Sequence, residues 1–421
     1  MSHLIREFRS RPAALCLAAL IGAAAFSSSS FSADKPKEEI SRSIAKEYMA
    51  AQKAYQASQW SEVVKNIEAA EAKPGLTNFD KTHIYDMKGY AYIRLNNLKA
   101  AESTYEQAMA AGSYSPEELA RTRHLLFQLA AQNQQNAKAI EYGKAVTESG
   151  AAGPNDFLLE SQLYYLQKDC KDSMAWADKA IASFRKANEA PKELLFQIKL
   201  QCASDASDTP GMTSALYELV RLTNKTSYWN NLIRLERQEE REDKNTLMIY
   251  RVMYDTNSMN ADTDYIEMAQ LLGDAALPGE AQLVLEKATN TGALKDEHKE
   301  RTARLLNSLK TRADTDKKGL PQFEAEASKN PAGQLDVKLG EVYYGAADCQ
   351  GAATAINRGL QKGQIKSMEE AYVYLGRSQV CLKNYAEAKK AFIGLKTVPN
   401  VSPRVLKLFE LYAEKVGQPL T

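Results

Sequence analysis

Repetition is the feature of the sequence that most constrains its fold. Helical apolar spacing runs along the chain, and short turns interrupt it roughly every 12 to 18 residues. The stretch from Tyr164 to Cys202 also lines up with the stretch from Tyr343 to Cys381, 179 positions later and without a gap. That offset equals five units of about 36 residues, the length of a helix-pair repeat. We therefore predict a stack of helix pairs without β-strands.

Three stretches carry the complete pattern of one pair. Each has a small residue in the first helix, then an alanine and, four residues later, a large side chain in the second helix. The small residue should let the second helix approach, and the large one should fill the gap toward the next pair. The sets are Gly89, Ala101 and Tyr105; Gly340, Ala352 and Ile356; and Gly376, Ala388 and Phe392.

This pattern resembles the tetratricopeptide repeat (TPR). The resemblance implies an all-α fold, a right-handed superhelical solenoid of about ten TPR-like helix pairs. A closing helix is expected from Ser402 to Val416. By the quality of the match, the chain divides into N-terminal repeats over residues 33–225, divergent helical repeats over 226–330, and C-terminal repeats with the closing helix over 331–421.

Two helix starts carry a capping-box pattern, a Ser followed three residues later by a Glu. They are Ser115 with Glu118, where Pro116 adds a favourable first helical residue, and Ser367 with Glu370. Asp314 to Gly319 imitates the opening of a calcium loop, but Ala325 stands where a closing Glu would be needed. We interpret that segment as a turn.

The N-terminus has the pattern of a signal peptide. Arg6, Arg9 and Arg11 precede an apolar stretch over residues 12–26, and small residues precede Ala33. The stretch is shorter than a comfortable membrane span, although an uncleaved anchor stays an alternative. We predict a signal peptide over residues 1–32 and a mature chain that leaves the cytoplasm.

Composition and charge exclude some classes of protein. Hydrophobic residues make up 44% of the chain and charged residues 25%, as in chains that bury a core. The net charge of +1 creates no overall field that would attract nucleic acid. No second apolar stretch has the length of a membrane span.

Four cysteines follow the predicted leader, and they form two pairs with the same spacing. Cys170 begins the second helix of a pair and Cys202 lies near the end of the next helix, while Cys349 and Cys381 repeat that arrangement. Because consecutive helices run antiparallel, the two members of each pair should lie level at one edge of the stack. Redox or metal-binding cysteines would need a CxxC spacing or nearby histidines, and the sequence has neither at these positions. Two structural disulfides, Cys170 with Cys202 and Cys349 with Cys381, are therefore predicted.

The usual signatures of catalysis and metal binding are not found in the sequence. It has no GxGxxG, phosphate-binding loop, GxSxG or HExxH motif, and its histidines are scattered. Arg234 to Lys244 is dense in both charge signs, which pairing along a solvated helix end would explain. We expect no enzyme activity, no cofactor and no metal.

The remaining candidate for function is the surface of the first helices. In such solenoids the first helix of each pair lines the concave face, where protein partners bind. Tyrosine and arginine are effective anchors for protein partners, although any one of these tyrosines could instead pack between repeats. The predicted partner-binding residues are Tyr48, Gln52, Tyr55, Tyr90, Arg94, Arg121, His124, Gln128, Gln162, Tyr165, Tyr344 and Arg377.

A closer resemblance rests on the order of several segments. They are the signal peptide, Ala180-Ile181-Ala182, Tyr217-Glu218-Leu219-Val220, the stretch from Lys225 to Leu232, Pro278-Gly279-Glu280-Ala281 and Leu285-Glu286-Lys287-Ala288. In this layout the chain resembles the periplasmic TPR proteins encoded beside the TonB–ExbB–ExbD genes of Gram-negative bacteria. The cysteine pairs and the charged stretch from Arg234 to Lys244 depart from that family.

The resemblance implies a periplasmic, non-enzymatic scaffold that serves TonB-dependent energy transduction and nutrient uptake. Its partner would be a periplasmic protein or peptide, with TonB or ExbD as candidates, and not nucleic acid. The alternative is a TPR adaptor in cell-envelope assembly, acting with outer-membrane or peptidoglycan machinery.

Overall fold

The structure, a computed structural model, describes residues 39–421, and within that range it contains α-helices and one short 3-10 helix but no β-strand. The predicted signal peptide, residues 1–32, lies outside the described residues. The chain forms two compact units, Met1–Ile198 (unit 1) and Lys199–Thr421 (unit 2). The prediction of an all-helical repeat fold is confirmed.

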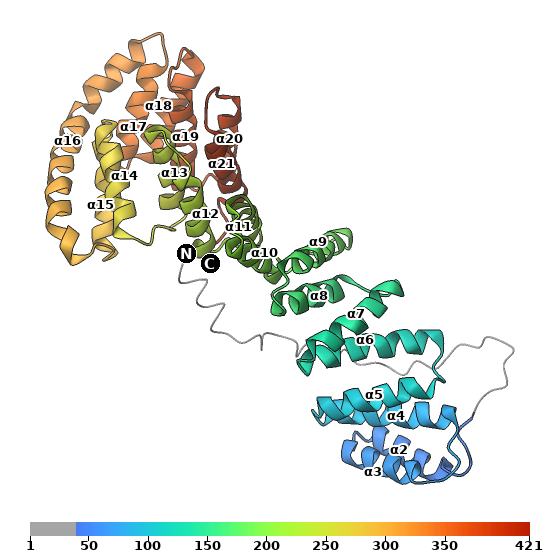
Figure 1. Cartoon of the computed structure of the whole chain (residues 1–421). Coiled ribbons are helices and arrows are strands. Elements are labelled where there is room, and N and C mark those ends of the chain that lie inside the picture. Colours follow the sequence, from blue (N-terminus) through green and yellow to red (C-terminus); the bar gives the residue numbers. More distant parts are fainter. Residues whose placement is uncertain (1–38) are drawn as a thin grey trace. The chain divides into compact units, whose positions relative to one another are not determined.

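In unit 1, four helix pairs follow one another along the described chain (Figure 1). The pairs are α2 (Ala45–Gln56) with α3 (Trp60–Glu71), α4 (Asn78–Arg94) with α5 (Leu98–Ala111), α6 (Pro116–Gln132) with α7 (Asn136–Glu148), and α8 (Pro154–Leu166) with α9 (Cys170–Lys186). The boundary between the units falls inside α10 (Glu193–Asp205).

One three-residue turn joins the two helices of nearly every pair. Its middle residue is a non-glycine residue with a positive φ, and the residue after it precedes the second helix. Where that last residue is Asp, its side chain accepts a hydrogen bond from the backbone of the second helix, as Asp169 does from the Asp172 N–H at 3.1 Å; Asn97 does the same, whereas Asn384 does not. The middle residues are Ser58, Asn96, Gln134, Lys168, Ser207, Ala276, Ala347 and Lys383.

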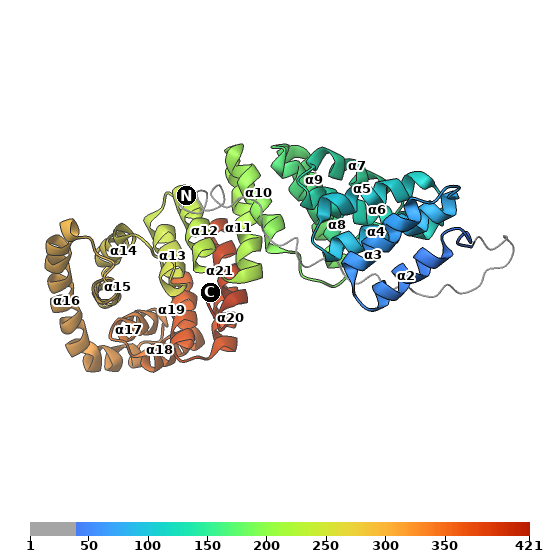
Figure 2. The ribbon, with the colours of Figure 1, turned by 90° about the horizontal axis from the view of Figure 1, so that it is seen from below.

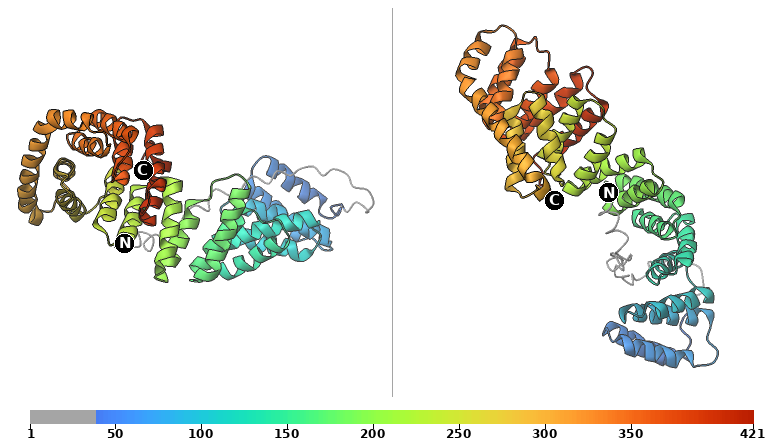
Figure 3. Two further views of the ribbon diagram at one scale, coloured as in Figure 1. Left: turned by 90° about the horizontal axis from the view of Figure 1, so that it is seen from above. Right: turned by 60° about the vertical axis from the view of Figure 1, so that its left-hand side comes forward.

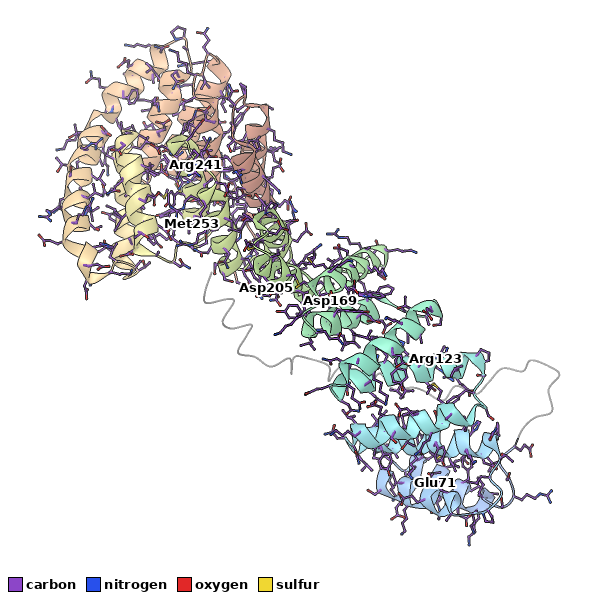
Figure 4. The ribbon with its side chains drawn as sticks, in the orientation of Figure 1. Glu71, Arg123, Asp169, Asp205, Arg241 and Met253 are labelled. Atoms are coloured by element: carbon purple, nitrogen blue, oxygen red, sulfur yellow. A yellow bond between two sulfur atoms is a disulfide. The ribbon has the colours of Figure 1, made fainter. Side chains whose placement is uncertain are left out.

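The packing inside a pair follows the predicted exchange of small and large residues. A Cβ atom built on Gly89 would lie 2.7 Å from Cε2 of Tyr105, so that ring needs a glycine beneath it. Tyr105 also packs with Leu126 and Leu129 of the next pair, which confirms that the large residue fills the gap toward it. Between pairs, Lys88 of α4 donates to both carboxylate oxygens of Glu71, which ends α3 (Figure 4).

Unit 2 continues the pairing but closes on itself. Its helices are α11 (Thr209–Thr223), α12 (Thr226–Gln238), α13 (Asp243–Asp255), α14 (Asp262–Asp274), α15 (Pro278–Asn290), α16 (Asp296–Lys329), α17 (Gln334–Gly345), α18 (Cys349–Lys362), α19 (Met368–Cys381), α20 (Tyr385–Gly394), the 3-10 helix η1 (Leu395–Thr397) and α21 (Pro403–Lys415). Figure 2 shows these helices arranged as a ring. No helix of the described chain is both long and apolar enough to span a membrane.

The closing helix α21 completes the ring. It packs against α11 and α13, which lie far earlier in the chain. Arg221 donates to Glu414 at 3.0 Å, and the Thr226 N–H donates to the carbonyl of Thr421 at 3.0 Å. The predicted closing helix is therefore present, and it joins the two ends of unit 2.

One predicted pair is instead a single helix. Helix pairs were predicted across the divergent repeats of residues 226–330, but α16 runs unbroken through the segment Asp314–Gly319 that we interpreted as a turn, and through Pro321. Its two ends pack on different neighbours, α15 and α17 (Figure 3). Buried Leu309 and Ala327 anchor it near those neighbours, and this packing outweighs the cost of an internal glycine and proline.

The two predicted capping boxes have different outcomes. Ser115 and Glu118 form the box as expected, with Glu118 accepting from the Ser115 N–H at 2.8 Å. The Ser367 side chain makes no capping hydrogen bond, and the prediction there is wrong. The reason is tertiary: Glu370 accepts instead from Arg251 Nη1 of α13 at 2.8 Å.

The charged stretch from Arg234 to Lys244 is also explained by tertiary contacts and not by pairing along one helix. Arg234 and Arg237 of α12 form ion pairs with Asp264 and Glu267 of α14, at 2.8 Å and 2.9 Å. These contacts tie two neighbouring pairs together. Arg241 lies in the loop between α12 and α13, where the recurrent turn is replaced (Figure 4).

Two cysteines of unit 2 form one of the predicted bridges. Cys349 at the start of α18 and Cys381 at the end of α19 are disulfide-bonded, with their Cα atoms 6.3 Å apart. The bridge between Cys170 and Cys202 stays a prediction. The predicted segment boundaries at residues 225 and 330 also stay predictions, because they were drawn from how well the sequence matches the repeat pattern, whereas the two units are defined by compactness.

Candidate functional site

The first helices of unit 1 form a continuous face that carries most of the predicted partner-binding residues. Direct contacts join neighbouring members of this row. Tyr55 of α2 packs against Tyr90 of α4, Tyr114 just before α6 donates to Asp86 of α4, and His124 of α6 meets Asp156 of α8. We call the side chains of α2, α4, α6 and α8 that lie along these contacts, with Trp60 and Tyr114 beside them, the first-helix face.

An aromatic–arginine cluster of Tyr55, Trp60, Tyr90 and Arg94 occupies the α2–α4 end of this face. The ring centroids of the three aromatic residues lie 5.3 to 5.6 Å apart in tilted or edge-to-face pairs. The exposed Arg94 places its guanidinium 4.8 Å from the Trp60 centroid and donates to the Tyr90 hydroxyl at 3.3 Å. Burial, with Tyr90 as a neighbour, raises the pKa of Tyr55 to about 12.

Gln52 and Tyr48 lie about one and two turns before Tyr55 on α2. Tyr48 is half-buried against the core of the first pair, and Gln52 is exposed. Burial raises the pKa of Tyr48, while the Gln52 side chain beside its hydroxyl acts in the opposite direction. Both residues therefore extend the cluster along α2.

The middle of the face holds a carboxylate that sequence reasoning missed. Asp86 of α4 accepts a hydrogen bond from the Tyr114 hydroxyl at 2.8 Å. Burial raises the pKa of Asp86, whereas this bond and the nearby His83 and Arg121 lower it. Arg121 is exposed on α6 and supplies positive charge here, as predicted for the face.

His124 links α6 to α8. Its Nε2 lies 2.7 Å from Oδ1 of Asp156, whose other oxygen accepts from the Gly153 N–H at 2.8 Å. This bond raises the pKa of His124. About a third of the His124 side chain is exposed, at 34%, so it is both a face residue and a contact between pairs.

The other predicted residues of unit 1 lie farther along the row. Gln128 on α6 and Gln162 and Tyr165 on α8 are half-buried. Trp60 and Tyr114 were missed because neither lies on a first helix. Trp60 could have been found from its position, because it begins α3 directly after the short turn that follows α2 and Tyr55.

The predicted residues of unit 2, Tyr344 and Arg377, do not form a comparable surface. Arg377 is only 2% exposed, and its guanidinium binds both oxygens of Asp255, at 2.9 and 3.0 Å. Tyr344 packs edge-on against Tyr374, with Arg377 stacked 4.8 Å from its ring centroid. The prediction that Arg377 is a partner-binding anchor is wrong, because the closed ring covers it.

Arg377 belongs to a buried ionic network at the centre of unit 2. Arg251, which is 0% exposed, donates to the two oxygens of Glu280 at 3.2 and 3.0 Å and to the Tyr374 hydroxyl at 2.7 Å. Tyr374 and Arg377 also donate to Glu280. Burial alone would raise the pKa of Glu280, but Arg251 and Arg377 hold it at about 2. This network connects α13, α15 and α19.

A cavity of about 260 Å³ lies between α15, α16 and α17 in unit 2. Its acidic lining includes three carboxylates that are already held by neighbouring cations. Glu280 binds the two arginines, Glu286 pairs with Lys310 at 3.1 Å, and Glu341 pairs with Lys338 at 2.8 Å. Among the described residues, no group of three or more His, Cys, Asp or Glu side chains is placed to hold a metal ion.

Comparisons with known proteins find similar solved structures at low sequence identity. No family model and no curated protein matches the chain. One similar solved structure is the C-terminal part of a TPR repeat-containing protein from Cytophaga hutchinsonii, with 12% identity, coverage of 62% of this chain and 95% of that one, and a TM-score of 0.35. Another is a TPR protein from Parabacteroides merdae, with 9% identity, coverage of 79% and 98%, and a TM-score of 0.30. A third is the TPR2AB domain of yeast Sti1 in complex with pHSP90, with 13% identity, coverage of 63% and 98%, and a TM-score of 0.31. The chain is thus similar to TPR proteins, while the resemblance to TonB-associated members stays a prediction.

Proposed function

We propose that the chain is a non-enzymatic scaffold that binds an extended segment of a partner protein along the first-helix face of unit 1. The observation that carries the proposal is the aromatic–arginine cluster. Stacked aromatic rings beside an exposed arginine are the kind of surface on which hot spots of protein recognition form. Of the two residues predicted in unit 2, Arg377 is buried and Tyr344 is half-buried.

The chemistry of the face favours a particular class of segment. Tyr48, Tyr55 and Trp60 offer ring faces and edges, against which proline-rich segments pack without further loss of chain entropy. Arg94 and Arg121 add positive charge that would bind carboxylates of the segment through charge-assisted hydrogen bonds. We therefore propose a proline-rich, charged and extended partner.

For the identity of the partner, we propose the periplasmic part of TonB or of ExbD. The support for this step is the sequence resemblance described above, together with the predicted export of the chain. TonB proteins carry a long extended periplasmic region, which suits a face built from successive helices. The scaffold would then be a periplasmic accessory of TonB-dependent nutrient uptake.

The test is binding by the mature chain from Ala33 onward to purified periplasmic segments of TonB and ExbD from the same organism, followed by calorimetry. Tyr90→Ala and Arg94→Ala should each weaken binding by about 1–2 kcal/mol. Lys99→Ala, an exposed change on the second helix α5, is the matched control and should leave the affinity unchanged. Equal losses for all three variants would place the partner on another face.

The second candidate is an adaptor in cell-envelope assembly, and the same face would serve it. Affinity capture from the periplasm with mass spectrometry separates the two roles. Recovery of outer-membrane assembly factors or peptidoglycan enzymes, with TonB and ExbD absent, would support the adaptor and overturn the TonB role.

A further inference from the structure

The junction between α7 and α8 in unit 1 departs from the packing of the other pairs. Within the α6–α7 pair the sizes are reversed, because the large Phe127 is on the first helix and Gly143 is on the second. A Cβ atom on Gly143 would lie 2.0 Å from Oε1 of Glu160 and 2.9 Å from the Phe127 ring. The space that the glycine leaves is therefore filled by a carboxylate of α8.

The burial of Glu160 is not compensated by hydrogen bonds. The residue is 1% exposed, and among the described residues neither of its carboxylate oxygens has a hydrogen-bond partner. The equivalent junction between α3 and α4 differs, because Lys88 of α4 meets Glu71 of α3 at 2.8 Å. Burying an ionised carboxylate without hydrogen-bond donors costs free energy, so the protonated, neutral form of Glu160 is favoured in the closed junction.

The charged groups around Glu160 come from three helices. Lys144 of α7 and Lys179 of α9 lower its pKa, and Asp156, one turn earlier on α8, raises it. Both lysines are exposed, whereas the Phe127 ring of α6 lies at the same space beside Gly143. Burial is the largest effect and raises the pKa of Glu160 to about 7.

A second titrating contact connects the same two helix pairs. His124 of α6 meets Asp156 of α8 at 2.7 Å, and this bond is strongest when the imidazole carries its second proton. Glu160 and His124 therefore act in the same direction. Each stabilises the closed junction when protonated, and each weakens it on losing a proton.

We propose that the α7–α8 junction is a proton-operated joint within unit 1, closed when Glu160 and His124 are protonated and looser when they are not. Both groups bind a proton more tightly in the closed junction than in an opened one. The closing effect of Glu160 is therefore fully present below its ordinary pKa of 4.5 and is lost as the pH rises to its raised pKa of about 7, and His124 adds to the loss above its ordinary pKa of 6.5. The proposal goes beyond partner binding, since it concerns the free chain.

The experiment is amide hydrogen exchange of the full mature chain between pH 5.5 and 8.5, read by mass spectrometry and corrected for the intrinsic pH dependence of exchange. Peptides from α7 and α8 should show an opening equilibrium that grows by up to about tenfold for each pH unit between pH 5.5 and about 7, where Glu160 keeps its proton only in the closed junction, and that levels off at higher pH. Glu160→Gln should remove most of that dependence. Glu148→Gln, which changes an exposed carboxylate of the same α7, is the matched control and should behave as the unchanged chain.

Two further variants keep the outcome decisive. Glu160→Met removes the charge at similar length, so it replaces Glu160→Gln if that variant loses helicity. His124→Gln should remove only the part of the pH dependence that Glu160→Gln leaves. Exchange in α7 and α8 that stays flat over this range, or that keeps its full pH dependence without the Glu160 carboxylate, would overturn the proposal.

Discussion

The first-helix face of unit 1 and the buried network of unit 2 use the same residue types for different ends. Tyr90 and Arg94 of α4 touch each other at the surface, while Tyr374 and Arg377 of α19 are 0% and 2% exposed. In unit 2, Arg251 of α13 and Glu280 of α15 bind these two side chains of α19 and cover them. The helices meet because α21, near the end of the unit, packs against α11 and α13 near its beginning. The position of a residue on a first helix therefore does not decide whether it can meet a partner.

The largest expected effect comes from breaking the network. Arg251→Ala leaves the buried Glu280 without its principal counter-charge, and removal of one partner of a buried ion pair costs about 3–5 kcal/mol. Urea denaturation followed by far-UV circular dichroism should show that loss. Arg94→Ala, made at the surface of unit 1, should cost less than about 1 kcal/mol. Similar costs for the two arginines would remove the distinction between the regions.

Loss of the disulfides should have the next largest effect. The bridge between Cys349 and Cys381 closes a loop of sequence separation 32, and replacing both cysteines with serine should destabilise unit 2 by roughly 3–4 kcal/mol. The same change at Cys170 and Cys202 serves as the comparison, and it should leave the exchange protection of α18 and α19 unchanged.

Peptide mapping of the non-reduced protein tests the pairing itself. It should join Cys170 to Cys202 and Cys349 to Cys381. Crosswise pairs or free thiols at residues 170 and 202 would show that the repeat register assigned around the unit boundary is wrong.

The two regions should also respond to pH in opposite directions. The pKa of Glu280 is depressed from its ordinary value of 4.5 to about 2, so its stabilising effect is present above pH 4.5 and is lost as the pH falls toward 2. That effect is on the order of 3 kcal/mol. The α7–α8 junction instead weakens as the pH rises. Hydrogen exchange at pH 3 and pH 5 should show α13 and α19 losing protection in acid, and unchanged protection there would argue against an ionised Glu280.

The smallest expected effect separates the two capping sequences. Ser115→Ala removes a formed capping box and should cost about 1 kcal/mol, measured by chemical denaturation. Ser367→Ala removes no cap, so only its contact with Gln334 is lost and the cost should be well under that value. A larger loss at Ser367 would mean that its helix start is capped in solution.

Several elements could be predicted from local sequence because their causes are local. Gly89 and Tyr105 lie in adjacent helices of one pair, and the cap at Ser115 involves residues three apart. The bridge between Cys349 and Cys381 followed from antiparallel neighbours in the same way. The cluster at Tyr55, Tyr90 and Arg94 was found in outline, although Trp60 was missed because it belongs to a second helix.

The repeat pattern by itself determined the helical pairs, their short turns and the helix that ends the chain. Ring closure decided the rest of unit 2, since it depends on contacts between α21 and helices far earlier in the sequence. Glu370 binds Arg251 and does not form its predicted cap, and Arg377 binds Asp255 and does not lie on the predicted surface. Both differences arise because a buried arginine needs carboxylate partners, and the tertiary fold decides which carboxylates are near it. No spacing rule within a repeat contains those partners, which lie more than 100 residues away.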